Sequence, residues 1–508
     1  MAVLGRLLIS TLLGLLILGV PAAAGFGTQS RSRTAPEGTT LDWSLPNGDR
    51  ASTRSAEVSP ISAENVARLH LRWRFRFLGS KISEPNSAPE ALRGVVATPI
   101  VAGGIVYIQD ATSTVYAIYR STGRLRWKHR FRAPNHGRNG LSFSSGSVYG
   151  ATDTTVFALS GATGRLLWQR RLVGPLEQYV DIAPVIANNL VYAATVGYPP
   201  GGRGALYALD AHTGAVRWRF STIKVPWRHP YEAGGGGAWY SPSVAANGDV
   251  YWGTANPYPL GGTARYPNGG AYPGRVLYTD SLVVLDGRSG RLLWADQVTP
   301  HDIRDYDFQL PPVLVPDTDL VVGAGKAGIV IAWDGATHRR LWQTRVGRHL
   351  NDSGPLPSRR VTVCPGFYGG VESPLAYEEG VVFVPVVNLC ARGSARGYEP
   401  ISSLDPVDGT GEFLALDVRD GTVLWKRTFP QPDFGCATSA DGVVFTSTFD
   451  GHIYALDAAT GATLWQTSAP AGINGCAALT GSLLLVPAGS ASSRNPHPPF
   501  ELVAYGLR

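Results

Sequence analysis

YALDAATGATLW, residues 454–465, decides the fold, because strings of the same form recur along the chain. Each string reads as an apolar strand, a turn that carries Gly or Asp, and a second strand that begins just before a tryptophan, which is the pattern of a β-hairpin. Another hairpin lies upstream of every string, so each unit has four short strands. The other six strings end at Trp127, Trp168, Trp218, Trp294, Trp342 and Trp425.

The spacing of the strings indicates a β-propeller. The shortest intervals are 41 residues, from Trp127 to Trp168, and 40 residues, from Trp425 to Trp465. A four-stranded antiparallel sheet repeated at about this interval is typical of a propeller blade. Longer intervals then contain loop insertions. We therefore predict an all-β fold, an eight-bladed β-propeller of four-stranded antiparallel blades with tryptophan-docking repeats.

Closure of the ring depends on the two ends of the repeat region. Residues 475–508 begin an eighth unit but never reach a strand with a tryptophan. The segment LHLRWRFRF, residues 69–77, carries Trp73 in the equivalent place and is expected to complete that sheet. Seven blades and an open solenoid are the alternatives, although a solenoid needs capping units that are not visible. We predict a signal peptide at 1–24, an N-terminal extension at 25–67 and the propeller at 68–508.

Composition agrees with short strands and tight turns. The chain has 61 Gly, 37 Pro, one Met and 16% charged residues, which argues against a helix-rich fold. The net charge of +7 is modest, and Arg and Lys are spread along the sequence. Binding to nucleic acid therefore gains no support.

The N-terminus resembles an export signal. Arg6 precedes an apolar run over residues 7–20, and Pro21 and three alanines follow. This arrangement predicts a signal peptide cleaved after Ala24. A membrane anchor is the competing interpretation, but the run is shorter than the roughly 20 residues of a spanning helix. We expect an exported protein, periplasmic or extracellular, without a stable membrane span after cleavage.

The four cysteines form neither a CxxC zinc motif nor a CxxCH haem motif, and they permit three pairings. Cys364 precedes the first strand of its blade and Cys390 follows the second, so both lie on one rim. Cys436 and Cys476 occupy matching GCA positions in consecutive blades. We predict the disulfides Cys364–Cys390 and Cys436–Cys476.

The repeat string resembles the repeat of the pyrroloquinoline quinone (PQQ) dehydrogenase superfamily over nearly all of the mature chain. Residues 43–73 are also similar to the opening of quinoprotein alcohol dehydrogenases. Similar blades occur in outer-membrane assembly scaffolds that bind no quinone, so the repeat implies the fold and not the chemistry.

Two segments resemble the family's metal and catalytic motifs. GTANPYP, residues 253–259, resembles GTGNPxP, which implies that Asn256 is a metal ligand. QVTPHDIRDYDF, residues 297–308, matches Q-x-TPHDxWDYD, which implies that Asp305 is the catalytic base and also binds the metal. Asp307 lies where lanthanide-using members have an extra acidic ligand. The resemblance thus implies PQQ with a calcium or lanthanide ion.

Four further matches concern the cofactor pocket. Trp239, in GGGGAWYSPSV, is like the tryptophan that forms the floor under the quinone. Lys326, in VVGAGKAG, lies where the family has a basic residue at the quinone oxygens. Asn388, in VPVVNLC, matches a pocket asparagine, and Arg138, in RAPNHGRNG, is a plausible pocket match.

Blade topology brings these matches to one rim. In an antiparallel blade, the start of the first strand and the end of the second lie on the same side. Trp239 and Asp305 precede or open first strands, whereas Asn256, Lys326 and Asn388 follow second strands. Oxygen ligands suit a hard cation that polarises a quinone carbonyl. Asp305 would take the proton of an alcohol hydroxyl while hydride passes to the quinone.

Three departures from the family pattern stand against these matches. The family supplies a metal-binding glutamate from a GxExGxRG-like segment, but here VGYPPGGRG has Pro199 or Pro200 near the expected acid. The adjacent-cysteine pair that roofs the quinone in many members is absent. A further glutamate expected before the first blade appears as Val96.

Each match also has a plain structural interpretation. Trp239 suits core packing, and Asn256 before Pro257 is good turn chemistry. The aspartates around Asp305 suit a solvated loop, and Lys326 an ordinary surface charge. Their order along the chain favours a site.

The predicted function is that of a secreted quinoprotein dehydrogenase for an alcohol, polyol or sugar. Without a CxxCH motif it needs an external electron acceptor, namely a cytochrome, a copper protein or a quinone. The alternative is a non-catalytic propeller that acts as an envelope binding or assembly scaffold.

Overall fold

The computed structural model divides the chain into two compact units, Met1–Gly38 and Thr39–Arg508. The predicted signal peptide at 1–24 and the first part of the extension lie outside the described residues. Arg138, Pro199 and Pro200 also lie outside them. The structure describes residues 42–56, 58–77, 95–135, 139–198, 201–224, 234–258, 262–270, 272, 274–400 and 403–507.

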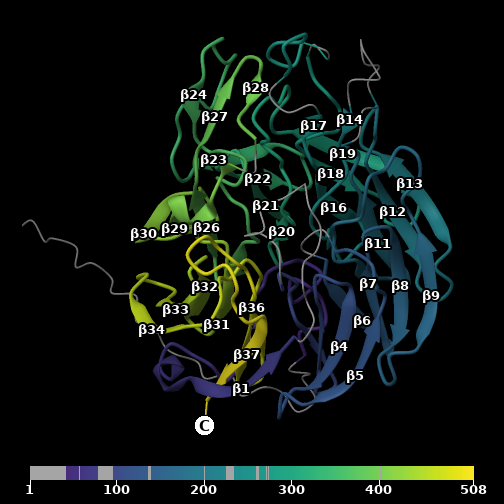
Figure 1. The fold of residues 1–508 in the computed structure, drawn as a ribbon, viewed down its shortest axis with the longest axis vertical. Coiled ribbons are helices and arrows are strands. Elements are labelled where there is room, and N and C mark those ends of the chain that lie inside the picture. The colour runs from purple at the N-terminus through teal and green to yellow at the C-terminus, as the bar shows by residue number, and fades with distance from the viewer. Residues whose placement is uncertain are drawn as a thin grey trace, which may run out of the picture. The chain divides into compact units, whose positions relative to one another are not determined.

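The described residues of the second unit form eight four-stranded antiparallel sheets, as the tryptophan strings predict, together with two smaller sheets (Figure 1). Sheets 1 to 4, in chain order, are β2 (Ile100–Ala102), β3 (Ile105–Gln109), β4 (Thr114–Tyr119) and β5 (Leu125–Arg130); β6 (Leu141–Ser144), β7 (Ser147–Ala151), β8 (Thr155–Ser160) and β9 (Leu166–Arg171); β10 (Val185–Ala187), β11 (Leu190–Thr195), β12 (Ala205–Asp210) and β13 (Val216–Ser221); and β15 (Ser243–Val244), β16 (Val250–Gly253), β18 (Ser281–Leu285) and β19 (Leu292–Gln297).

Sheets 5 to 8 continue the same order, and the last one takes its outer strand from the N-terminal side. They are β20 (Val313–Leu314), β21 (Leu320–Gly325), β22 (Ile329–Asp334) and β23 (Arg340–Arg345); β25 (Ala376–Glu378), β26 (Val381–Asn388), β29 (Thr410–Asp417) and β30 (Val423–Phe429); β31 (Thr438–Ala440), β32 (Val443–Ser447), β33 (His452–Asp457) and β34 (Thr463–Ser468); and β35 (Ala478–Thr480), β36 (Leu483–Ala488), β37 (Glu501–Gly506) and β1 (His70–Arg76).

Short elements occupy the insertions. A two-stranded sheet pairs β14 (Gly234–Gly235) with β17 (Pro257–Tyr258). A three-stranded sheet contains β24 (Val361–Val363), β27 (Ala391–Ser394) and β28 (Gly397–Tyr398). Two 3-10 turns, η1 (Val66–Arg68) and η4 (Pro406–Asp408), lie among the described residues. None of the helical segments in this part of the chain has the length and apolar character of a membrane span.

The tryptophan of each outer strand joins its sheet to the next. The indole N–H of Trp127 in sheet 1 donates to the carbonyl of Gly161 in sheet 2 at 3.0 Å. Gly164 lies under the indole at φ +72°, and a Cβ there would meet the ring at 2.6 Å. The turn needs glycine both for the left-handed backbone and for this close approach. Comparable indole hydrogen bonds link sheet 2 to 3, 3 to 4, 5 to 6 and 6 to 7.

The ring closes through β1, as predicted. β1 pairs antiparallel with β37, with Trp73 opposite Ala504. The indole of Trp73 donates to the carbonyl of Arg120 in sheet 1 at 2.9 Å, and that of Trp465 in sheet 7 donates to the carbonyl of Leu69 at 3.1 Å. Sheet 8 is therefore joined to both neighbours.

One turn departs from the repeat. His338 stands where the other strings have glycine, yet it keeps the left-handed φ of +63°. Its ring stacks on Trp294 with 4.7 Å between ring centroids and 15° between planes. A histidine side chain thus covers the indole that a bare glycine backbone covers elsewhere.

The N-terminal segment from Trp43 to Ala56 contacts most of the sheets. Its backbone carbonyls accept hydrogen bonds from the first strands or the residues beside them, at Val101, Phe143, Val244, Leu314, Tyr377 and Ser439. These donors lie in sheets 1, 2, 4, 5, 6 and 7. The segment therefore fastens the inner strands to one another, a role that the sequence did not indicate.

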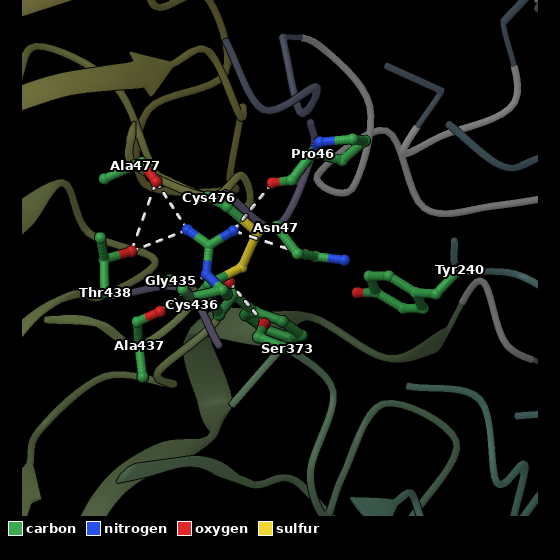
Figure 2. The surroundings of a disulfide bond; sticks show 12 residues. Pro46, Asn47, Tyr240, Ser373, Gly435, Cys436, Ala437, Thr438, Cys476 and Ala477 are labelled. Carbon is green, nitrogen blue, oxygen red and sulfur yellow. Dashed lines mark hydrogen bonds between the residues drawn. A yellow bond between two sulfur atoms is a disulfide. The ribbon is translucent and has the colours of Figure 1, made fainter. Parts of the chain in front are cut away.

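Arg54 anchors this segment to residues around the Cys436–Cys476 disulfide, whose surroundings Figure 2 shows. Its fully buried guanidinium donates to the carbonyls of Ala437 and Ala477 at 2.7 and 2.6 Å and to that of Pro46 at 3.0 Å. Burial lowers the pKa of Arg54 to about 9. The neighbouring Cys436–Cys476 bond joins the loops that precede β31 and β35.

Both disulfides expected from the sequence are present. Cys364 and Cys390 have Cα atoms 4.5 Å apart, and Cys436 and Cys476 have theirs 4.8 Å apart. The second and third strands of each sheet supply most of the buried apolar side chains, and the outer strands are largely exposed. The outer edge of the ring is consequently polar, and the interior between the sheets is apolar.

Candidate active site

The predicted residues lie where blade topology puts them. Asp305 lies in the loop before β20, and Trp239 precedes β15. Asn256 follows β16, Lys326 directly follows β21, and Asn388 ends β26. All five are on the rim where first strands begin and second strands end, so the topological expectation is met.

Asp307 is fixed between two sheets by its own backbone. Its carbonyl accepts the amide N–H of Lys326 at 3.0 Å, and the next residue, Phe308, bridges Thr254. Gly325 permits this approach, because a Cβ there would lie 2.2 Å from the Asp307 carbonyl oxygen. Asp307 is therefore completely buried between the ends of β16 and β21.

Lys326 joins the two predicted carboxylates. Its ammonium lies 2.8 Å from Asp305 Oδ2 and 2.7 Å from Asp307 Oδ2. The exposed fractions of Lys326, Asp305 and Asp307 are 7, 6 and 0%. A buried ammonium between two carboxylates is costly unless all three charges are compensated, and such clusters are common at functional sites.

The loop from Asp302 to Tyr306 positions Asp305. The carboxylate of Asp302 accepts the amide N–H groups of Arg304 and Tyr306, each at 2.7 Å. This capping holds the intervening Asp305 at φ +68°, a left-handed conformation that non-glycine residues seldom adopt. The guanidinium of Arg304 turns away and donates to the carbonyls of Asn351, Ser353 and Gly354.

The electrostatics of the cluster follow from burial and crowding of acids. Burial raises the pKa of Asp305 to about 8, with a further contribution from Asp307 and opposition from Lys326. Burial raises the pKa of Asp302 to about 6. Burial alone would lower the pKa of Lys326, but the charges of Asp305 and Asp307 hold it well above its usual range. The site carries more acidic groups than cations.

Asn256 connects the carboxylates to an aromatic pair. Its backbone N–H donates to Asp307 Oδ1, and its side-chain amide oxygen accepts a hydrogen bond from the Tyr198 hydroxyl. Tyr198 stacks on Trp239 with ring centroids 5.4 Å apart and planes 22° apart. One face of Trp239 is thus covered by a tyrosine.

Trp239 is a partly buried indole beside this cluster. Its N–H has no hydrogen-bond partner among the described residues. Tyr179 lies against the same ring with centroids 6.0 Å apart. Trp239 also lines a small cavity with Asn47, Ser241 and Asn474, which lie at the starts of several sheets and in the N-terminal segment.

Several residues of the site were missed in the sequence. Tyr198 lies in VGYPPGGRG, one position before the proline that replaces the expected glutamate, and its aromatic character gave no signal of contact with Asn256. Asp280 is completely buried, and neither carboxylate oxygen has a partner among the described residues. Glu372 accepts the side-chain amide of Gln309 at 2.8 Å, and its charge helps raise the pKa of Lys326.

Two predicted residues are not joined to the cluster. Asn388 lies on the same rim, but its side chain accepts the amide N–H of Arg348 at 2.7 Å and donates to Glu412 at 3.2 Å. Arg138 is outside the described residues. Their assignment to a cofactor pocket stays a prediction.

The oxygen atoms of this cluster are of the type that binds a hard cation, but only two of the side chains that supply them are carboxylates. Asp305, Asp307 and Asn256 offer oxygen ligands of the kind that calcium and lanthanide ions prefer. Within the described ranges, no three His, Cys, Asp or Glu side chains are grouped closely enough to hold a metal ion. Lys326 supplies the positive charge between the two carboxylates. A flat, acidic cofactor would find an indole face at Trp239 and an ammonium at Lys326, with Tyr198 as its competitor for the indole.

Comparisons with known proteins agree with the fold. A family model described as outer membrane protein assembly factor BamB (PQQ_2) matches residues 68–257, 111–362 and 279–491. A quinohemoprotein alcohol dehydrogenase of Comamonas testosteroni is 28% identical over 494 residues, which span 82% of this chain and 67% of that protein.

Two solved structures show the same fold. The crystal structure of the Comamonas testosteroni quinohemoprotein alcohol dehydrogenase superposes with a TM-score of 0.77 at 23% identity, covering 92% of this chain and 80% of that one. A europium-containing methanol dehydrogenase gives 0.75 at 20% identity, covering 92% of this chain and 98% of that one.

Proposed function

This chain belongs to the PQQ-repeat β-propeller family, and from that premise and the geometry of the site we propose that it is a quinoprotein dehydrogenase that oxidises an alcohol. The observation that carries the proposal is the buried ammonium of Lys326 between the carboxylates of Asp305 and Asp307. The relatives named above act on alcohols, and the substrate class here is an alcohol, polyol or sugar.

Asp305 is the general base of the proposed reaction. It accepts the proton of the substrate hydroxyl, a role that requires an ionised carboxylate at a fixed position. The Asp302 cap fixes the position, and Lys326 stabilises the ionised form. Burial raises the pKa of Asp305, and Lys326 opposes that rise. A second cation beside Asp305 would lower this pKa further, because an opposite charge favours the ionised carboxyl.

The cofactor of the proposed enzyme is PQQ with calcium or a lanthanide. The bound quinone would accept hydride from the alcohol carbon. Trp239 would bind one face of its ring system, and Lys326 would hold negative charge at its oxygens. Asn256, Asp305 and Asp307 would bind the ion. The completely buried Asp307 adds charge at the site, which favours a trivalent ion over a divalent one.

The electron acceptor and cell compartment complete the proposal. The proposed electron acceptor is an external cytochrome, copper protein or quinone. The signal-like N-terminus supports export to the periplasm or the outside of the cell. A purely structural scaffold, which the name of the matching family model suggests, has no need of a buried Lys–Asp–Asp cluster that costs desolvation energy.

Reconstitution of the purified protein tests the proposal. PQQ is added with calcium or with lanthanum, and its absorbance and the alcohol-dependent reduction of an electron-accepting dye are followed. Binding of PQQ together with turnover supports the enzyme. Asp307→Ala is expected to reduce turnover with lanthanum more than with calcium. Failure to bind PQQ with either metal would contradict the proposal and favour a scaffold.

A further inference from the structure

Exposed cations gather on one part of the outer edge of the ring, which is formed by the outer strands. The outer strands of sheets 8, 1 and 2 are β1, β5 and β9, and they follow one another along the outer edge (Figure 1). We call their exposed cations, together with those beside these strands, the basic band. It consists of Arg72, Arg74, Arg76, Arg124, Arg126, Lys128, Arg130, Arg132, Arg165, Arg170 and Arg171.

Strand periodicity produces the band. In β5, Trp127 and His129 point toward the neighbouring sheet, so Arg126, Lys128 and Arg130 are the exposed positions. Alternate residues of a strand face opposite sides, and one basic set therefore faces solvent. The three strands are connected, because Trp73 docks on sheet 1 and Trp127 on sheet 2.

Little acidic charge neutralises the band. The sequence has no Asp or Glu between Asp110 and Asp153. Among the described residues, the band's ion pairs are those of Arg74 and Arg76 with one shared carboxylate, Glu501, at 3.9 and 3.4 Å. Arg72, Arg170 and Arg171 donate to backbone carbonyls, which leave their charge uncompensated.

The outer strands of other sheets contrast with the band. Arg217 and Arg219 of sheet 3 pair with Asp210 and Glu177 at 2.6 and 2.7 Å. Arg340 of sheet 5 pairs with Asp296, and Lys426 of sheet 6 with Glu412. Basic residues on the rest of the outer edge are thus largely paired with acidic residues. The unpaired cations of the basic band therefore produce a local positive potential.

We propose that the basic band docks the protein on an anionic phospholipid surface. Ten of its eleven cations are arginines, whose planar guanidinium binds phosphate oxygens through two hydrogen bonds. The band spreads over three adjacent sheets, so it can contact several headgroups at once. Leu71, Leu125 and Leu167 stand exposed among the arginines, at 45, 43 and 41%, and supply apolar contact. The candidate active site lies on the strand-end rim and not on these outer strands, so docking leaves it free.

Co-sedimentation with vesicles tests the proposal on the full mature protein. The protein is mixed with vesicles of phosphatidylcholine alone or with about one third phosphatidylglycerol, a composition rich in anionic lipid. We expect binding to the anionic vesicles that weakens as salt is added, because salt screens exposed charges. The triple variant Arg126→Glu, Lys128→Glu and Arg130→Glu should bind about a hundredfold more weakly, since each lost contact near the surface costs about fivefold.

A matched control changes the same number of charges elsewhere. The control is a triple variant with Arg345→Glu, Lys426→Glu and Arg427→Glu. It lowers the net charge by the same amount, but its substitutions lie on β23 and β30. This variant should retain at least about a fifth of the wild-type vesicle binding, a margin of roughly one charge contact. Both variants should keep the wild-type circular dichroism spectrum and dye-linked activity.

Three outcomes of the comparison between variants and vesicles would overturn the proposal. They are equal loss of binding by both triple variants, unchanged binding by the band variant, and no preference for anionic vesicles. Release from vesicles by duplex DNA at equal phosphate concentration would also overturn it, because it would show that a nucleic acid is the better ligand.

Discussion

Gly164→Ala tests whether tryptophan docking holds neighbouring sheets together. Alanine at φ +72° costs about 1 kcal/mol in backbone conformation alone. The new Cβ would also lie 2.6 Å from the Trp127 ring, so the indole must shift. The shift weakens the 3.0 Å hydrogen bond to Gly161, worth about 1 kcal/mol, and adds about 1 kcal/mol of overpacking. We expect a total of about 3 kcal/mol.

Gly146→Ala is the matched control in the same sheet. Its φ is +78°, and a Cβ there would meet nothing within 4 Å, so only the backbone cost of about 1 kcal/mol remains. Urea unfolding followed by tryptophan fluorescence measures both variants. A difference of about 2 kcal/mol supports docking as a main link between sheets. Equal destabilisation of the two variants would refute this reasoning.

Three further changes probe other parts of the molecule. Burial raises the pKa of Glu378 to about 8, so its contribution to stability is complete below about pH 4.5 and is lost as pH rises through about 8. Glu378→Gln should therefore raise the free energy of unfolding in urea by about 2 kcal/mol at about pH 9 and by little at about pH 5. An equal increase at both pH values would show that ionisation of Glu378 is not the cause. Tyr198→Phe frees the amide oxygen of Asn256 and should tighten terbium binding about fivefold, measured by luminescence, whereas unchanged affinity would show that this hydrogen bond does not compete with the ion. Deleting residues 68–76 removes the partner of β37 and should cause aggregation in light scattering, and a soluble monomer with unchanged melting temperature would contradict ring closure through β1.

The sequence predicts the sheets well because their signals are local. A strand, a turn and a tryptophan lie within a dozen residues, and the outer strand of sheet 8 was recognisable from Trp73. Both disulfides followed from the same blade topology. The position of His338 in a glycine turn was not foreseen, because its compensation is a ring stack with another sheet.

The sequence predicts that several site residues lie on one rim, but it does not predict their contacts. Blade topology predicted that Asp305 and Lys326 lie on one rim, yet the ammonium between two carboxylates depends on how the loop before β20 approaches β21. The stacking of Tyr198 on Trp239 and the burial of Asp280 likewise join separate segments. Long-range juxtapositions of this kind have no periodic signal in a single sequence.

The basic band could not be predicted from the sequence for the same reason. Along the chain, basic residues are spread over many strands, and their clustering becomes visible only when outer strands of consecutive sheets are adjacent. The N-terminal segment is similar, because its carbonyls pair with first strands that are up to several hundred residues away. Both features come from the ring and not from any local motif.

The comparison of Asp305→Asn with the wild-type protein tests the central claim most directly. Both proteins are reconstituted with PQQ and metal, and cofactor affinity and dye-linked alcohol oxidation are measured side by side. Asparagine keeps the shape of the side chain but removes the base, so PQQ should remain bound while turnover falls by about 10²–10⁴. Full PQQ-dependent turnover by Asp305→Asn would contradict the assignment of the base and, with it, the proposed enzyme mechanism.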